Sequence, residues 1–170
     1  MSIKLLKTRK AKDPQRREGD AGIDIFVPEK TDEFARDLAI KNKIVMLSET
    51  GDGIKVNPHE SILIPTGIKS EFDSSLALVA FNKSGIATKT GLIVGACVID
   101  SSYQGEWHVH LINTTDEVQV VKFGQKITQF VPLQIGVDKL KVSNIKDVSE
   151  DEFFLSETAR GAGGFGSTGV

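Results

Sequence analysis

The feature that most constrains the fold is a series of short apolar or alternating segments, separated by turns rich in Gly, Pro, Asn and Asp. β-Branched residues are frequent in these segments, and each is about 4–8 residues long, which predicts strands rather than helices. The predicted strands cover residues 23–27, 61–65, 76–81, 107–112, 118–123 and 127–131. Many short strands at this spacing indicate an all-β fold, which could be a sandwich, a jelly roll or a barrel.

One segment, residues 31–42, is predicted to be helical. Thr31 or Asp32 is suited to cap it, acidic residues fill its first turn, and Phe34 and Leu38 lie four residues apart on one face. An apolar face of this kind must be buried against something. The alternatives are packing on the chain's own barrel and docking of another protein.

Length, charge and cysteine content narrow the class of protein. The 170 residues suffice for one domain with its own core, and the net charge of −2 excludes a broadly basic nucleic-acid-binding surface. Cys97 is the only cysteine, so no disulfide can form within the chain and a reducing compartment is expected. The first twelve residues lack the apolar run of a signal peptide, and no stretch approaches the roughly 18 apolar residues of a membrane span. We expect a cytoplasmic protein, or one of the host cytoplasm if it is viral.

Residues 159–170 are predicted to form a flexible Gly-rich arm. Its glycines allow close backbone approach to a ligand, and successive N–H groups can cradle phosphate oxygens. Arg160 adds a forked donor for phosphate, and Phe165 can stack on a flat base. The alternative from composition alone is an inert linker.

Residues 91–106 combine an apolar run with an acid, small polar residues, a tyrosine and a glycine. This pattern predicts a hairpin whose turn presents Asp100 and Tyr103. Taken alone, however, a carboxylate at the end of a hairpin is usually a turn residue.

Two smaller patterns place charged groups next to strands. Residues 82–85 follow a strand and offer the cation of Lys83 and the hydroxyl of Ser84. Asp24 lies inside a strand between apolar neighbours, where an acid is rare unless it is paired or near a metal. The alternatives are an ordinary turn and an acid on an edge strand.

Histidines offer a weaker metal-site hypothesis. His108 and His110 are expected on the same face of one strand, a spacing that some metal sites use. Only His59 remains as a third imidazole, and no acid lies nearby in register, which disfavours a zinc or iron site.

Taken in order, these patterns resemble the five motifs of the trimeric dUTPase family. The corresponding segments are residues 21–25 (AGIDI), 83–85 (KSG), 95–106 (GACVIDSSYQGE), 124–130 (GQKITQF) and 160–169 (RGAGGFGSTG). Each motif alone is weakly specific, whereas five in order with compatible spacing are strongly so. The resemblance covers nearly the whole chain, one domain over residues 1–170, except for an apparent insertion at about 29–55.

The resemblance implies an all-β, jelly-roll-like β-barrel or sandwich that forms a homotrimer, with each active site built from three chains. It also implies hydrolysis of dUTP to dUMP and pyrophosphate. Asp100 is implied as the general base for a water that attacks the α-phosphorus. Mg²⁺ is the implied cofactor and neutralises the triphosphate, with Asp24 holding it through water. Such an enzyme keeps uracil out of DNA and supplies dUMP for dTMP synthesis. No stable nucleic-acid or membrane partner is expected.

The resemblance also assigns the substrate contacts. Backbone groups between Val94 and Val98 would pair with uracil, and Tyr103 would pack beneath the sugar and exclude a 2′-hydroxyl. A lid formed by the C-terminal arm would close over the nucleotide. The implied substrate-binding residues are Lys83, Ser84, Gly85, Val94, Cys97, Val98, Ile99, Tyr103, Gln129, Arg160, Phe165, Gly166 and Ser167.

Several positions depart from the family pattern. Lys83 stands where the family usually has arginine, and it keeps the charge but loses the bidentate fork. Cys97 occupies a usual glycine position, and Thr128 replaces the commoner alanine. Because extra loop length costs little entropy, we expect a short Gly/Ser loop in place of residues 30–53 to keep hydrolysis within about tenfold.

Three other functions remain as alternatives. A dCTP deaminase shares the fold but needs a glutamate where this chain has His110. A dUTP-sensing regulatory protein would use the same site and bind a protein partner at the 29–55 insertion. A structural jelly-roll subunit would explain the strands but not the terminal motif.

Overall fold

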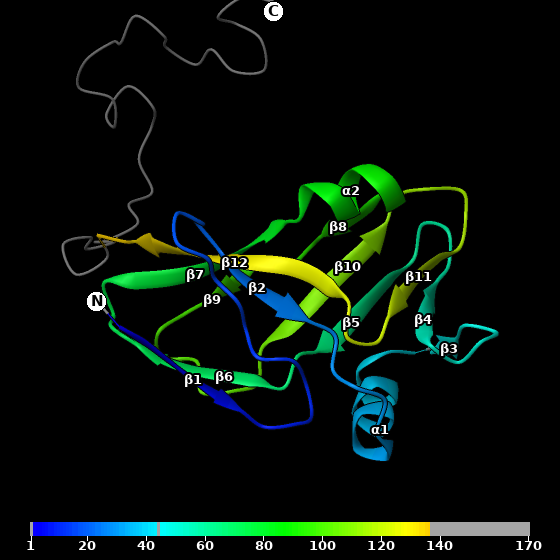
Figure 1. The fold of residues 1–170 in the computed structure, drawn as a ribbon, viewed down its shortest axis with the longest axis horizontal. Helices are drawn as coiled ribbons and strands as arrows, with labels where there is room; N and C mark the ends of the chain where they lie inside the picture. The colour runs from blue at the N-terminus through cyan, green and yellow to red at the C-terminus, as the bar shows by residue number, and fades with distance from the viewer. Residues whose placement is uncertain (1, 44, 137–170) are drawn as a thin grey trace, which may run out of the picture. The chain divides into compact units, whose positions relative to one another are not determined.

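The computed structural model describes residues 2–43 and 45–136, and within these ranges the chain forms four β-sheets and two short helices (Figure 1). The helices are α1 (Asp32–Lys41) and α2 (Ser84–Thr90). The prediction of a β-structured chain with a short helical segment is confirmed, although α2 was not predicted. The arm predicted for residues 159–170 lies outside the described residues.

The largest sheet has the strand order β2-β12-β7-β9, with neighbours antiparallel. Its strands are β2 (Ile23–Phe26), β7 (Leu76–Asn82), β9 (Val98–Ile99) and β12 (Lys126–Gln134). They lie far apart along the chain, so the backbone hydrogen bonds of the ladder bring them side by side. Each of these strands contains or directly precedes residues of one of the motifs.

A second sheet, in the order β5-β10-β8, corrects the hairpin predicted within residues 91–106. Its strands are β5 (Ser61–Pro65), β8 (Leu92–Val94) and β10 (His108–Asn113). β9, which precedes the turn of Asp100 and Tyr103, pairs with β7 in the first sheet, whereas β10, which follows that turn, pairs with β5 and β8. The turn therefore does not close a hairpin, and β8 and β9 also belong to different sheets. Leu92 and Ile99 enter the same buried core from different sheets, and this burial outweighs pairing between neighbouring segments.

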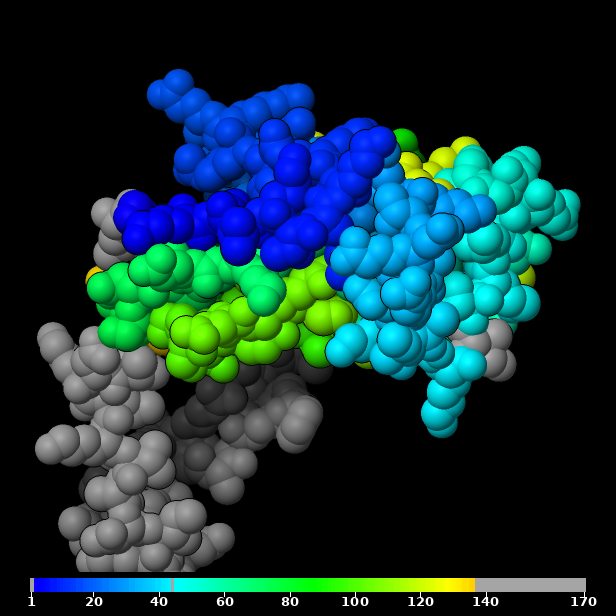
Figure 2. All heavy atoms as spheres, turned by 90° about the horizontal axis from the view of Figure 1, so that it is seen from below, coloured from blue at the N-terminus to red at the C-terminus, as the bar shows by residue number. Residues whose placement is uncertain are grey.

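Two smaller sheets complete the described part of the chain. One has the order β11-β4-β3, and the other pairs β1 with β6. Their strands are β1 (Ile3–Lys7), β3 (Met46–Leu47), β4 (Gly53–Val56), β6 (Ile68–Phe72) and β11 (Gln119–Lys122). Figure 2 shows β1, in dark blue, lying along the green segment that contains β6.

The helix α1 packs on its own chain. Thr31 is its N-cap, with a side-chain oxygen that accepts a hydrogen bond from the N–H of Phe34 at 3.1 Å. Phe34 and Leu38 are buried in the core. Asn42 exchanges hydrogen bonds of 2.9 and 2.8 Å with the backbone of Leu63 on β5. The apolar face that the sequence left with two alternatives is therefore covered by the chain itself.

The core draws buried side chains from α1 and from strands of all four sheets. Trp107 lies at its centre without exposed surface, and its ring centroid is 4.7 Å from that of Phe130 on β12. Phe34 meets Phe123 edge to face, with centroids 6.1 Å apart. Neither helix within the described ranges has the length and apolar content needed to cross a membrane.

Candidate active site

The largest sheet brings three of the predicted site residues together. Asp24 on β2 is the register partner of Gln129 on β12. On the other side of β12, β7 ends at Asn82, directly before Lys83. Residues that are more than a hundred positions apart in the sequence, Asp24 and Gln129, thus face each other across one ladder.

Asp24 is a buried carboxylate held between two ammonium groups. Nζ of Lys83 lies 2.8 Å from its Oδ1, and Nζ of Lys126 lies 2.6 Å from its Oδ2. Burial by itself would raise the pKa of Asp24, but the two lysines outweigh burial and lower it. The carboxylate therefore stays ionised, and the group of three carries one net positive charge.

Both oxygens of this carboxylate face a cation. Oδ1 is buried and has Nζ of Lys83 as its ion-pair partner at 2.8 Å. Sequence reasoning did not select Lys126. Its only local signal was a basic residue at the start of the fourth motif, and its contact with Asp24 depends on the pairing of β2 with β12.

The glycine of the first motif has a packing reason. A Cβ atom at Gly22 would lie 2.8 Å from Oε1 of Gln129 and 2.9 Å from its Cβ, which is too close for a side chain. Nε2 of Gln129 donates a hydrogen bond of 3.3 Å to the carbonyl of Asn82. Gly22 therefore leaves the space in which Gln129 reaches the end of β7.

Ser84 and Gly85 form the first turn of α2 and are exposed. Backbone N–H groups in the first turn of a helix have no intrahelical acceptor. A Cβ atom at Gly85 would meet nothing within 4 Å, so packing within the described chain does not require a glycine there. This turn, next to the cation of Lys83, suits an anionic ligand.

A separate pocket gathers residues of the third motif. It has a volume of about 220 Å³, and Asp100 and Tyr103 are among the residues that line it. The residues that line it are Leu63, Ala96, Cys97, Val98, Ile99, Asp100, Tyr103, His108 and Phe130. Of the stretch from Val94 to Val98 that was predicted to contact uracil, Val94 and Gly95 are absent from this lining.

Several backbone groups before β9 are already used within the chain. The amide of Val94 donates to Oδ1 of Asn82 at 2.7 Å, and those of Gly95 and Ala96 donate to the carbonyl oxygen and Nδ1 of His110. Among residues 2–43 and 45–136, β9 is the last strand of its sheet, so within this part of the chain one side of its backbone has no strand partner. The edge of β9 is therefore the part of this segment that is open to a ligand.

The turn that follows β9 is fixed by hydrogen bonds. The amide of Tyr103 donates to the carbonyl of Asp100 at 3.0 Å, and its hydroxyl donates to the carbonyl of Glu106 at 2.9 Å. The ring of Tyr103 lies against Gly105, where a Cβ atom would overlap it. Asp100 itself is exposed at the rim of the pocket, so water can reach its carboxylate.

The histidines do not form a metal centre. His108 and His110 share one face of β10, as predicted, but Nδ1 of His108 lies 2.8 Å from the carbonyl of Glu106 and His110 binds the amide of Ala96. Burial lowers the pKa of His108, which keeps its imidazole neutral. Among residues 2–43 and 45–136 no group of three His, Cys, Asp or Glu side chains is arranged to hold a metal ion.

The predicted site therefore appears in one chain as two groups. Within the described part of the chain, the pocket of Asp100 and Tyr103 is not lined by any residue of the other group, which comprises Asp24, Lys83, Ser84, Gly85 and Gln129. The remaining predicted contacts, Arg160, Phe165, Gly166 and Ser167, lie outside the described residues.

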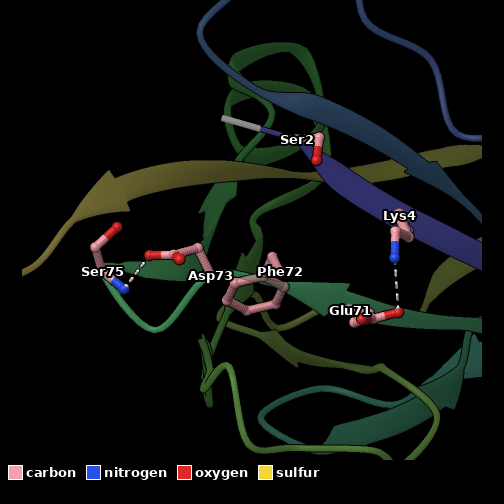
Figure 3. A pocket seen from close by; sticks show the side chains of 6 residues that line it. All are labelled: Ser2, Lys4, Glu71, Phe72, Asp73 and Ser75. Carbon is pink, nitrogen blue, oxygen red and sulfur yellow. Dashed lines mark hydrogen bonds and ion pairs between the residues drawn. The ribbon is translucent and has the colours of Figure 1, made fainter.

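A larger surface hollow lies elsewhere on the molecule. It has a volume of about 610 Å³ and is lined by residues of β1, β6 and the turn after β6 (Figure 3). Lys4 pairs with Glu71 at 3.3 Å across it, and Asp73 accepts a hydrogen bond from the amide of Ser75 at 2.8 Å. None of the motif residues lines it.

Comparison with known proteins places these features in a family. The family model described as dUTPase matches residues 51–169. The deoxyuridine 5′-triphosphate nucleotidohydrolase of Desulfitobacterium hafniense is 38% identical over 120 residues, which is 69% of this chain and 74% of the relative. The enzyme of the same name from Wolbachia pipientis shows the same identity and coverage.

Solved structures show the same fold at lower identity. The dUTPase of Staphylococcus bacteriophage 80alpha, a mutant solved with dUpNHpp, has a TM-score of 0.66 at 22% identity and covers 99% of both chains. A dUTPase of phage phi11 of S. aureus, solved to describe the coordination of a structural Mg(II) ion, has a TM-score of 0.61 at 18% identity. It covers 92% of this chain and 100% of that one.

Proposed function

The chain belongs to the dUTPase family and is a dUTP diphosphatase, and we propose that it cuts dUTP by attack of water on the α-phosphate, with Asp100 as the general base. The observation that supports this assignment is the pocket of about 220 Å³ in which Asp100 and Tyr103 lie beside the open edge of β9. Such an activity keeps uracil out of DNA and supplies dUMP for dTMP synthesis.

In the proposed reaction Asp100 accepts a proton from the attacking water. The water oxygen bonds to the α-phosphorus, the bond from that phosphorus to the bridging oxygen breaks, and pyrophosphate leaves. Phosphoryl chemistry of this kind depends mainly on positioning and charge neutralisation. The exposed rim position of Asp100 provides the access to water that the base requires.

Uracil is proposed to bind along the edge of β9. Because Val94, Gly95 and Ala96 donate their amides within the chain, we place the base against the backbone of Cys97, Val98 and Ile99. The carbonyl of Cys97 accepts the amide of Ala80 at 2.7 Å, which fixes this stretch before a ligand arrives. A preformed edge of this kind rejects bases whose donors and acceptors do not match.

The triphosphate is proposed to bind the positively charged group on the largest sheet. Lys83 supplies the cation, and Ser84, Gly85 and Gln129 supply hydroxyl, backbone and amide donors. Asp24 would then lose part of its pairing with Lys83 as the phosphates compete for the same ammonium. The contacts from Arg160, Phe165, Gly166 and Ser167 remain as implied by the fifth motif.

The dUTPase family uses Mg²⁺, and the residues present fit an ion that arrives with the nucleotide. As the phosphates draw Lys83 away, Oδ1 of Asp24 could accept a hydrogen bond from a metal-bound water, whereas the two neighbouring ammonium groups oppose direct contact with a dication. We therefore propose that Asp24 holds Mg²⁺ through water. When bound, Mg²⁺ neutralises charge on the triphosphate oxygens.

We propose that the complete site forms between copies of the chain in a homotrimer. The base and sugar contacts line the pocket, whereas the phosphate contacts, at β2, β12 and the residues after β7, do not line it. Phe81, Val98 and Leu133 are exposed on neighbouring strands of the largest sheet and share one face through its register. An apolar face of this kind is suited to a second copy.

The test is release of pyrophosphate from each deoxynucleoside triphosphate, with and without Mg²⁺, by the purified full chain. We expect turnover of dUTP alone, dependent on Mg²⁺, and no ammonia from dCTP. Release of ammonia from dCTP would establish the deaminase alternative. Binding of dUTP without turnover would leave only the sensing function.

A further inference from the structure

A buried ion pair lies behind the pocket of Asp100 and Tyr103. The side chain of Arg9 is 5% exposed, although arginine is usually among the most exposed residues. Its Nε donates to Oε1 of Glu106 at 2.8 Å and its Nη2 to Oε2 at 2.6 Å, a bidentate pair. Nη2 also donates to Asp37 of α1 at 2.8 Å. Figure 2 shows this face, with the dark-blue start of the chain beside the light-blue segment that contains α1.

Glu106 links the ion pair to the pocket: its side chain binds Arg9, and its backbone carbonyl contacts two residues that line the pocket. Its Oε1 also accepts the amide of Gly67 at 2.5 Å. Its carbonyl oxygen accepts the hydroxyl of Tyr103 at 2.9 Å and lies 2.8 Å from Nδ1 of His108. Both Tyr103 and His108 line the pocket, so one carbonyl orients two of its walls.

Stability alone does not explain this arrangement. Burying two charges costs desolvation that the pairing often fails to recover, and Nη1 of Arg9 is buried with no hydrogen-bond partner among the described residues. The forked geometry of guanidinium, in contrast, fixes the direction of a carboxylate as an ammonium does not. Such a pair suits the task of holding Glu106 in one orientation.

We propose that Arg9 is a positioning residue for the candidate active site, acting through Glu106 on Tyr103 and His108. Arg9 lies outside all five motifs and touches no proposed substrate group. By holding Glu106, whose carbonyl accepts the Tyr103 hydroxyl, Arg9 determines the position of the Tyr103 ring in the pocket. That position determines the space left for a 2′-hydroxyl on the sugar. The effect on selectivity rests on the proposed function, whereas the effect on the Tyr103 ring does not.

Tyr103 offers a direct readout, because it is the only tyrosine in the chain. Protein made with ring-¹³C tyrosine gives signals from this ring alone. We expect Arg9→Met and Glu106→Gln to shift or broaden those signals in protein that remains folded. Glu71→Gln is the matched control: it removes an ion pair between β1 and β6, but Lys4 and Glu71 are 71% and 77% exposed (Figure 3).

The second readout is the ratio of kcat/KM for dUTP to that for UTP. Because a small misplacement of a positioning group can cost on the order of 10²-fold, we expect this ratio to fall at least about tenfold in Arg9→Met and Glu106→Gln. The double variant should lose no more selectivity than either single variant, since both act through one contact. Glu71→Gln should leave the ratio unchanged.

Arg9→Lys is a milder variant that tests the proposal if Arg9→Met does not fold. It keeps the charge, so Glu106 is not left unpaired, but it removes the fork, and we expect intermediate selectivity and a shifted Tyr103 signal. Unchanged ring signals in folded Arg9→Met and Glu106→Gln would overturn the proposal, as would lower stability with unaltered selectivity. A wild-type chain that turns over no dUTP would refute the proposed function, while the Tyr103 signals would still decide the role of Arg9.

Discussion

At the residue scale, two carboxylates of this chain differ in burial and in charge pairing. Asp24 is buried between two ammonium groups that lower its pKa, and Asp100 is exposed at the rim of a pocket. A paired, buried carboxylate is suited to orient cations and water, whereas one that water reaches is suited to accept a proton. Environment rather than residue type thus separates their proposed roles.

The first prediction concerns Asp100. We expect Asp100→Asn to lower turnover of dUTP by at least ~10²-fold with the fold intact, because a positioned general base contributes about that much. Asp116→Asn, a change at an exposed turn, serves as the control. Near-normal turnover in purified Asp100→Asn would exclude Asp100 as the base.

The second prediction concerns Lys83. Lys83→Arg should keep or raise the rate, because guanidinium restores a forked donor for phosphate and keeps the charge beside Asp24. Lys83→Ala should cost far more, since it removes a phosphate cation and leaves Lys126 as the one remaining partner of Asp24 among the described residues. Steady-state rates measured for all three forms decide the point: equal values would mean that this side chain does not face the triphosphate.

The third prediction follows from the lowered pKa of His108. Burial keeps this imidazole neutral, so the unfolded chain takes up a proton at a higher pH than the folded one. The stabilisation is complete above the ordinary value of 6.5 and is lost as pH falls toward the lower folded pKa. We expect wild type to lose unfolding free energy as the pH falls through and below the ordinary value of 6.5, and His108→Gln to lose less. The unfolding free energy is measured by urea titration at each pH. The same pH dependence in wild type and His108→Gln would contradict a lowered pKa for His108.

At the scale of elements, α1 behaves as part of the core rather than as an appendage. The sequence suggested that a short loop could replace residues 30–53 with little loss, but Phe34 and Leu38 are buried and Asn42 is bonded to Leu63. The replaced stretch also contains β3, which pairs with β4. We now expect loop replacement to impair folding before it impairs chemistry.

The fourth prediction tests this role of α1. Phe34→Ala should lower the unfolding free energy by about 3–5 kcal/mol, the usual cost of deleting a buried phenyl ring. Ile40→Ala is a matched control on the same helix, because Ile40 is 72% exposed and surface changes usually stay within about 0.5 kcal/mol. Denaturant titration measures both, and similar small losses would mean that α1 docks loosely on the barrel.

Prediction of elements succeeded where side chains are strongly patterned. β2, β5, β7, β10, β11 and β12 coincide closely with predicted strands, and the Thr31 cap and the apolar face of α1 are as expected. β1 and β6 were missed because most of their side chains are not buried and their alternation is weak. α2 was missed because it is short and buries no residue.

At the scale of the whole molecule, we propose that a partner chain joins the two groups of site residues. The residues around Asp24 do not line the pocket of Asp100, and exposed apolar side chains lie on one face of the largest sheet. A trimer in which one copy supplies the pocket and another supplies Lys83 and Gln129 would join them. The family resemblance implies this arrangement, and the absence of Lys83 and Gln129 from the lining of the pocket is consistent with it.

The fifth prediction tests the shared site by mixing two inactive chains. Asp100→Asn and Lys83→Ala damage different groups, so co-expressed chains that assemble together should recover part of the dUTP turnover that each lacks alone. Chains mixed after separate assembly, without exchange, are the control. Light scattering gives the mass of the active species. A co-assembled mixture as inactive as its parents would place a complete site within each chain.

The sequence by itself determined what local patterns can encode: the strands with strong alternation, the cap of α1, the motif residues and, through their order, the dUTPase family. Tertiary structure alone decided which of these meet. It split β8 and β9 between two sheets, placed Lys126 beside Asp24 and joined Arg9 to Glu106. Periodicity specifies which face of a strand is buried, but strand partners are chosen by non-local hydrogen bonds and shared burial. Contacts between residues far apart in the chain therefore became visible only in the folded molecule.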